Sequence, residues 1–237
     1  MPISTVFFDI GDVLFSEDAP HAMLLHCVYQ AVSRAGVDVG WDRFASQFRQ
    51  CMRRSPASAV RDAVNAVVGD AGDGGDIYEQ GHEIYQQARY PRRYGMLHDD
   101  ITGVVESIHA RYKTGIIANQ HPVIMEALSD YRLLRHFDVV VIDEIVGVSK
   151  PDPAIFQFAC EQAGCDPRET IMVGDRPDND IAPAKRLGMG TVRFRNGQFY
   201  VYYDPLHEDE RADAEVRTAA QIPIAVDMVA AMREKSP

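Results

Sequence analysis

In the second half of the chain, short apolar runs alternate with segments whose apolar residues recur at helical spacing. The runs have the length and the β-branched or aromatic content of buried strands. Helices that join successive strands through short loops leave those strands parallel, so the pattern predicts an α/β fold with helices on both faces of a parallel sheet. Expected elements are helix 98–111, strand 114–118, helix 122–130, strand 138–142, helix 153–164, strand 170–174, helix 179–187, strand 190–194 and a closing helix at 222–232.

An apolar run at residues 4–10 predicts a further strand, and after it the pattern changes to helices alone. Asp18 and Pro20 form a helix start signal, and Gly36 ends that helix. An all-helical block of this length between two strands predicts a small inserted domain. The expected helices begin near residues 18, 41, 55 and 77 and end near residues 36, 52, 69 and 88.

The composition narrows the classes of protein to which the chain can belong. A net charge of −11 over 237 residues argues against nucleic acids and anionic membranes as partners, because both require clustered cations. No apolar run approaches 18 residues, and the first residues lead into a strand without a basic region or a cleavage site. The four cysteines include no C-x-x-C pair. We therefore expect a cytoplasmic protein that acts on a small molecule.

Polar residues that could react or bind a ligand stand at the ends of the predicted strands. Asp9, Asn119 and Asp175 each follow an apolar run, and Lys150 lies in Ser-Lys-Pro just before a predicted helix. Ligands of open parallel sheets bind outside the carboxyl ends of the strands. Two carboxylates and a lysine gathered at that edge suit a divalent cation and a phosphate.

The order and spacing of these four stretches resembles the haloacid dehalogenase (HAD) superfamily of hydrolases over most of the chain. The resemblance implies a Rossmann-like core with the first strand at the centre of the sheet. It also identifies the all-helical block as a cap domain inserted after that strand. The implied core comprises residues 1–16 and 95–237, and the implied cap comprises residues 17–94.

The resemblance implies a reaction as well as a fold. Asp9 is the implied nucleophile, Lys150 neutralises charge on the phosphate, and Asn119 belongs to the motif that holds a phosphoryl oxygen. A carboxylate that attacks phosphorus divides a difficult hydrolysis into two easier steps. The implied function is Mg²⁺-dependent hydrolysis of small phosphorylated molecules, specifically phosphate monoesters, through an aspartyl-phosphate intermediate.

The implied metal ligands come from the first and fourth motifs. They are the carboxylates of Asp9 and Asp175 and the main-chain carbonyl of Gly11, a small set that suits Mg²⁺ because this ion keeps several waters. Asp180, five residues after Asp175, is interpreted as a group that orients metal-bound water or Lys150. Capping of the following helix is the alternative part for Asp180.

Two positions depart from the usual pattern of the family. Gly11 stands where most of its phosphatases have an aspartate that serves as general acid and then as base, a group typically worth about 10²–10⁴-fold in rate. Ala118 stands where a serine or threonine usually donates to the phosphoryl oxygen. Asp12 is one residue too far along and is expected to point differently. The N–H groups of Asn119 and Gln120, or the Asn119 amide, are the expected substitutes for the missing hydroxyl.

These departures leave two alternatives open. One is a non-catalytic or weakly active HAD-like protein that binds its ligand. The other is a metal-free 2-haloacid dehalogenase in which Asp9 attacks carbon. The missing aspartate at position 11 favours the dehalogenase, whereas the carboxylates of Asp175 and Asp180 favour a metal site. His121, directly after the second motif, is a further candidate proton donor.

Overall fold

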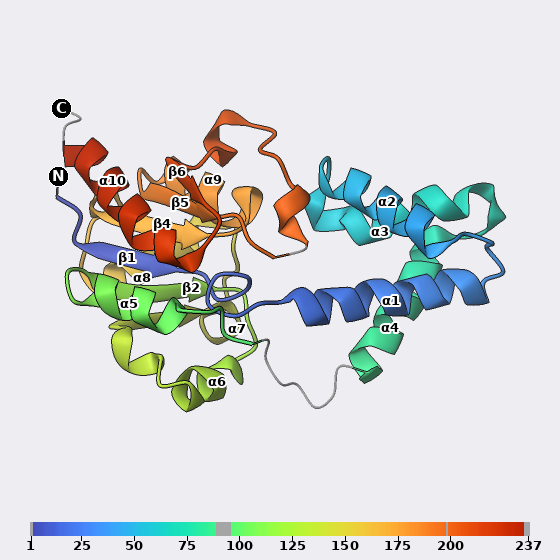
Figure 1. Ribbon diagram of the computed structural model, residues 1–237, viewed down its shortest axis with the longest axis horizontal. Coiled ribbons are helices and arrows are strands. Elements are labelled where there is room, and N and C mark those ends of the chain that lie inside the picture. The colour runs from blue at the N-terminus through green and yellow to red at the C-terminus, as the bar shows by residue number, and fades with distance from the viewer. Residues whose placement is uncertain (1, 89–95, 198, 235–237) are drawn as a thin grey trace. The chain divides into compact units, whose positions relative to one another are not determined.

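A computed structural model of the chain describes residues 2–88, 96–197 and 199–234 (Figure 1). The chain divides into two compact units. One contains residues 1–16, 96–196 and 205–237, and the other contains residues 17–95 and 197–204. The first unit is an α/β domain and the second is all-helical.

The α/β unit is built on a six-stranded parallel sheet with the order β3-β2-β1-β4-β5-β6. Phe8 at the end of β1 pairs with Ile116 in β2 and with Val173 in β4, so three carboxyl ends meet at one edge. The sheet confirms the predicted α/β fold and the central place of the first strand. The strands are β1 (Thr5–Phe8), β2 (Lys113–Ala118), β3 (Val139–Ile142), β4 (Thr170–Gly174), β5 (Gly190–Phe194) and β6 (Ala214–Val216). The sequence did not predict β6, because three residues are too few to carry a periodic signal.

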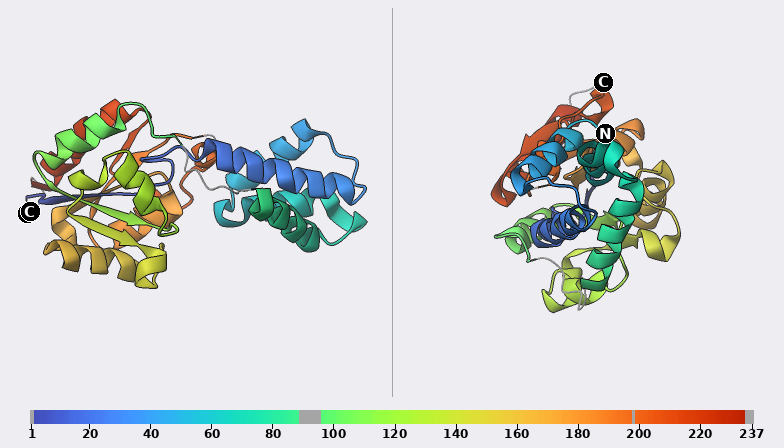
Figure 2. Two further views of the ribbon diagram at one scale, coloured as in Figure 1. Left: turned by 90° about the horizontal axis from the view of Figure 1, so that it is seen from below. Right: turned by 90° about the vertical axis from the view of Figure 1, so that its right-hand side faces the viewer.

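Helices cover both faces of the sheet (Figures 1 and 2). On one face, Phe7 of β1 is buried against Phe156 of α8 and Ala184 of α9; α5 and α10 contact each other on the opposite face. The helix predicted at 179–187 is replaced by a π-helical turn, Pro177–Ile181, and a short α9. Pro183 lacks the N–H that an uninterrupted α-helix would need there. The helices are α5 (Ile101–His109), α6 (Ile124–Asp130), α7 (Asp143–Val146), α8 (Pro153–Ala163), α9 (Ala182–Arg186) and α10 (Ile222–Glu234).

The second unit contains the four helices that the sequence predicts, together with a segment that it does not. Phe199 and Tyr203 are buried in the apolar core of this unit, and the Phe199 ring lies 4.6 Å from the Phe48 ring. The predicted core domain, residues 1–16 plus 95–237, includes residues 197–204. Their aromatic side chains instead fill the helical unit, which corrects that boundary. The helices are α1 (Asp18–Arg34), α2 (Trp41–Met52), α3 (Ala59–Val68) and α4 (Gly74–Ala88).

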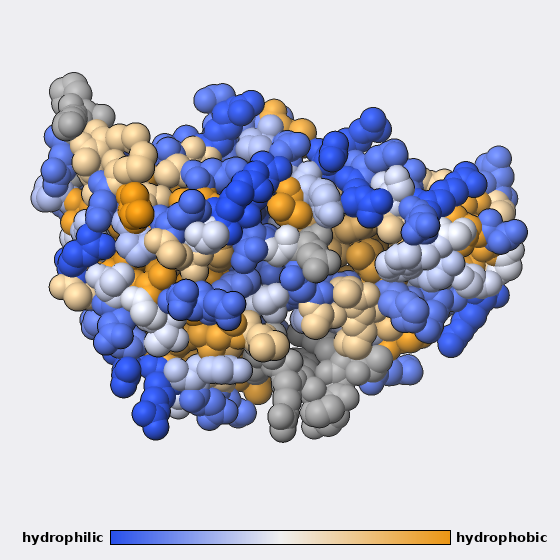
Figure 3. All heavy atoms as spheres, viewed as in Figure 1, coloured by the Kyte–Doolittle hydropathy of each residue, from blue (hydrophilic) through white to orange (hydrophobic). Residues whose placement is uncertain are grey.

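Hydrophilic side chains dominate the face seen in Figure 3, and small apolar areas interrupt them. Exposed apolar side chains on α10 include Ile224 and Met228. None of the described helices combines the length and the apolar character that crossing a membrane requires.

Candidate active site

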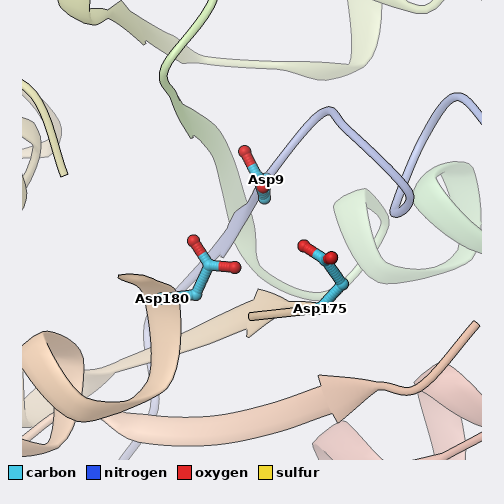
Figure 4. A group of neighbouring side chains, drawn as sticks. All are labelled: Asp9, Asp175 and Asp180. Carbon is cyan, nitrogen blue, oxygen red and sulfur yellow. The ribbon is translucent and has the colours of Figure 1, made fainter. Parts of the chain in front are cut away.

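The carboxylates at the ends of β1 and β4 converge, as the parallel register requires. Asp9 donates its main-chain N–H to Val173 O over 2.9 Å, which places the ends of the two strands side by side. Asp180 joins them from the turn that follows β4 (Figure 4). One carboxylate oxygen from each of Asp9, Asp175 and Asp180 lies within 4.8 Å of the others, and all three residues are buried. We call this set the acidic cluster.

Lys150 reaches the acidic cluster from the loop between α7 and α8. Its Nζ lies 2.7 Å from Asp9 Oδ1 and 2.6 Å from Asp180 Oδ1, and its side chain is 1% exposed. Asn119 at the end of β2 holds the main chain of this lysine, since its Nδ2 donates to Lys150 O over 2.9 Å and its Oδ1 accepts from Lys150 N over 2.8 Å. The structure therefore brings residues from all four sequence motifs together at one edge of the sheet.

The acidic cluster carries more negative charge than the lysine balances. With every group ionised, three carboxylates (−3) and Lys150 (+1) give a net charge of −2 in a buried site. Burial raises the pKa of Asp9 to about 7, with Lys150 opposing this shift and Asp180 adding to it. Burial also raises the pKa of Asp175 well above its usual range, and the charges of Asp180, Asp9 and Asp12 add to it. A divalent cation would balance this charge.

Lys150 remains a cation in spite of its burial. Burial alone would lower the pKa of its ammonium group, but the Asp180 and Asp9 carboxylates outweigh that effect and raise the pKa above its usual value. A buried charge is tolerated when it is paired and hydrogen-bonded. The lysine is consequently a permanent positive charge directly beside Asp9.

The donor set of the acidic cluster fits a small, hard cation, and its three members are not equivalent. Asp180 Oδ1 accepts from Lys150, and Asp180 Oδ2 accepts from the main-chain N–H of Arg176 over 3.0 Å. Both oxygens of Asp180 thus have protein partners, which suits a group that orients Lys150. A divalent cation bound here would take its carboxylate ligands from Asp9 and Asp175.

The loop after β1 explains how Gly11 and Asp12 are placed. Ile10 O accepts the N–H groups of Leu14 and Phe15 over 2.9 and 3.0 Å, so the chain turns immediately after Asp9. Asp12 has a left-handed φ of 50° and is 1% exposed. Its charge raises the pKa of Asp175, as noted above, so its carboxylate belongs to the buried side of the site.

The groups expected to replace the missing hydroxyl at Ala118 are largely engaged elsewhere. The N–H of Gln120 donates to Asp143 Oδ1 over 2.8 Å. The Asn119 amide binds the main chain of Lys150 through both its oxygen and its nitrogen. Asn119 therefore has a structural role that sequence reasoning missed, because it holds the main chain of Lys150 in place. Of the three groups proposed to hold an oxyanion, the Asn119 N–H is the one with no such competing role.

Sequence reasoning also missed Arg193, a charged residue in the middle of a buried strand. Its side chain is 1% exposed, and its Nε donates to Asp175 O over 3.1 Å. Its NH1 lies 3.5 Å from the Glu215 carboxylate on β6. A buried arginine is uncommon unless it is paired, so a charged residue inside the apolar run of β5 was the available signal. Arg193 supports the main chain of Asp175 from the neighbouring strand.

Gly174 makes room for Asp180 at the end of β4. A Cβ added at this glycine would lie 2.5 Å from Asp180 Oδ2, a separation that real Cβ atoms essentially never show. The glycine is required for this close approach and not for a positive φ. Asp180 can fold back over the strand end towards Lys150 because position 174 has no side chain.

Comparison with known proteins agrees with this geometry. The profile of a family described as haloacid dehalogenase-like hydrolase matches residues 3–188. The glyceraldehyde 3-phosphate phosphatase of Methanocaldococcus jannaschii is 36% identical over 96% of this chain and 97% of its own. That of Methanopyrus kandleri is 46% identical, but the match spans only 34% of either chain. A magnesium-bound putative HAD-hydrolase from Bacillus subtilis, YfnB, shares the fold with a TM-score of 0.63 and 17% identity, covering 96% of this chain and 100% of its own.

Replacement of Gly174 by alanine tests the packing of Asp180. We expect Gly174→Ala to lower the free energy of unfolding by about 1–3 kcal/mol, because the new methyl group overpacks against Asp180. Gly103→Ala is the matched control, since an added Cβ in α5 meets nothing within 4 Å. Alanine there should leave stability unchanged or raise it by up to about 1 kcal/mol. Equal effects of the two changes in urea unfolding would contradict this account of Gly174.

The raised pKa of Asp9 predicts how the stability of the metal-free protein depends on pH. Folded Asp9 keeps its proton up to about pH 7, whereas the ordinary value is 3.8. The folded state then binds more protons than the unfolded state between these values, so the free energy of unfolding falls as pH rises from about 4 to about 7. Asp9→Asn should flatten this slope, and exposed Asp99→Asn should not. Urea unfolding in the presence of a chelator measures both, and an unchanged slope in Asp9→Asn would refute the assignment.

Proposed function

Since the chain belongs to the haloacid dehalogenase-like hydrolases, we propose that it is a Mg²⁺-dependent phosphatase that forms an aspartyl-phosphate on Asp9. The observation that carries this proposal is the convergence of Asp9, Lys150 and Asp175 in one buried site. An isolated carboxylate after a strand would be an ordinary turn residue. A carboxylate that shares its site with a buried lysine and a second strand-end carboxylate has the surroundings that attack on phosphorus requires.

In this proposal each residue of the site has a defined role. Lys150 binds Asp9 Oδ1, which fixes the carboxylate and leaves its other oxygen to attack the phosphorus. The ammonium charge offsets the repulsion between the carboxylate and an anionic phosphate. Asp180 keeps Lys150 in place from the opposite side. The N–H of Asn119 is the proposed donor to a phosphoryl oxygen.

Asp9, Asp175 and the main-chain carbonyl of Gly11 are the proposed ligands of Mg²⁺. When bound, the ion would balance the net charge of the site and polarise the phosphoryl oxygens. Asp175 is suited to this part because its main chain is anchored by Arg193 and its carboxylate stands beside Asp9.

The proposed substrates are small phosphate monoesters in the cytoplasm. The full-length relative bears the name glyceraldehyde 3-phosphate phosphatase, so short phosphorylated sugars and their acids are the compounds to try first. The cysteines Cys27, Cys51, Cys160 and Cys165 are free thiols, which suits a reducing compartment.

Removal of the proposed nucleophile tests the mechanism. We expect Asp9→Asn to lose at least about 10³-fold in kcat on a panel of phosphate esters with Mg²⁺, because the asparagine amide cannot attack phosphorus as the carboxylate does. Asp175→Ala should lose activity at the same time as Mg²⁺ affinity, measured by titration calorimetry. Asp99→Asn, a change at an exposed carboxylate, should retain wild-type rates. Wild-type turnover by Asp9→Asn would disprove the mechanism, and chelator-insensitive halide release from a 2-haloacid would favour the dehalogenase.

The absence of a side chain at Gly11 predicts a strong dependence of rate on the leaving group. We expect kcat/KM on aryl phosphates to fall steeply as the pKa of the phenol rises, because a poor leaving group needs the proton that an acid would supply. Gly11→Asp should raise the rate on the poorest leaving groups by about 10²-fold, and Gly11→Asn should not. A flat dependence in the wild type would show that another donor, such as Asp12 or His121, protonates the leaving oxygen.

A further inference from the structure

Lys150 lies in a loop, so the position of its ammonium group depends on the contacts that fix that loop. The residue lies between α7 and α8, yet its Nζ is held within 2.7 Å of two different carboxylates. A lysine side chain has about 2 kcal/mol of rotamer entropy to lose, and a mobile main chain would add to this cost. Asn119 binds the main chain of Lys150 directly, and this contact ties the loop to the end of β2.

Asp143 makes a second connection between the same two segments. Its Oδ1 accepts from the N–H of Gln120 over 2.8 Å, and its Oδ2 accepts from Ser149 Oγ over 2.7 Å. One carboxylate therefore joins the residue after Asn119 to the residue before Lys150. The pairing of Ile142 with Ala118 sets this geometry, because it places the end of β3 beside the end of β2.

Ordinary helix capping does not account for Asp143. It lies in the first turn of α7, a helix of four residues whose N-cap, Ile142, makes no side-chain cap hydrogen bond. Its carboxylate accepts from two residues outside α7, namely Gln120 after β2 and Ser149 in the loop that carries Lys150. Hydrogen bonds to an ionised acceptor are about twice as strong as those between neutral groups, so the two contacts can hold the loop.

We propose that Asp143 is a positioning residue for the phosphatase reaction, which fixes Gln120 and Ser149 and thereby sets Lys150 against Asp9. The inference rests on the proposed function, because it concerns the same lysine. Asp143 itself touches neither Asp9 nor Lys150 in any of these contacts. Its effect reaches the site through the two residues that flank the Asn119–Lys150 contact.

Three variants distinguish a positioning role of Asp143, which depends on its hydrogen bonds, from an effect of its negative charge alone. Asp143→Ala removes both contacts, and Ser149→Ala removes one. Asp143→Asn retains both, since its oxygen accepts from Gln120 N–H while its NH₂ group donates to the Ser149 hydroxyl. The expected losses in kcat are about 10–100-fold for Asp143→Ala, less for Ser149→Ala and least for Asp143→Asn. KM should change less than kcat, because Lys150 acts chiefly on the charge of the transferring phosphoryl group.

Amide hydrogen exchange supplies a readout that does not depend on activity. The N–H of Lys150 donates to Asn119 Oδ1, so its exchange rate reports how often the loop opens. We expect this rate to rise at least about tenfold in Asp143→Ala. Glu126→Gln is the control, because it neutralises an exposed carboxylate of α6 and should change neither kcat nor exchange.

The outcomes separate this inference from the proposed function. A fall in kcat together with faster exchange at Lys150 supports Asp143 as a positioning residue. Wild-type kcat in Asp143→Ala overturns the inference, as does a fall in kcat while the Lys150 amide stays protected. If Asp143→Ala does not fold, the same two criteria apply to Ser149→Ala. Should Asp9→Asn retain activity, the proposed function fails first, whatever the Asp143 variants do.

Discussion

The ion pairs that Lys150 makes with Asp9 and Asp180 are the interaction on which the site depends. Three buried carboxylates so close together repel one another and lose the solvation that water would give them. One lysine between two of them relieves part of this cost and leaves more acidic groups than cations in the cluster. Removal of one partner from such a buried pair is strongly destabilising, so the chain must hold the lysine firmly. The divalent cation proposed above would balance this excess of acidic groups.

The sheet brings the main chains of the site residues together, and contacts from neighbouring residues orient their side chains. Adjacent parallel strands bring Asp9 and Asp175 together because Phe8 pairs with Val173. That register alone does not orient the side chains. Gly174 leaves the space into which Asp180 folds, and Arg193 anchors the main chain of Asp175. The site is therefore a product of the sheet edge and of a layer of contacts just outside the reacting atoms.

The strand-end residues could be predicted from the sequence, whereas the contacts that hold them in place could not. Strands and motifs were predictable, because apolar runs of strand length end in Asp9 and Asp175, and parallel topology then dictates that they meet. The two hydrogen bonds between Asn119 and Lys150 were not predictable, because they join two loop segments 31 residues apart and no hydrophobic periodicity marks them. Asp143 was missed for the same reason. The burial of Phe199 in the helical unit was missed because chain order, the basis for placing it, says nothing of which core an aromatic side chain will fill.

The loop that carries Gly11 and Asp12 changes the balance of the chemistry. A side chain at position 11 would serve proton transfer, and this chain has none there. Asp12 has a left-handed φ of 50° and is buried, and its charge adds to the raised pKa of Asp175. The loop thus has no side chain at position 11 for proton transfer, while it strengthens the negative field that would attract a cation. In the proposed mechanism, such a site depends on charge neutralisation by Lys150 and the cation, and this dependence favours substrates whose leaving groups depart without a proton.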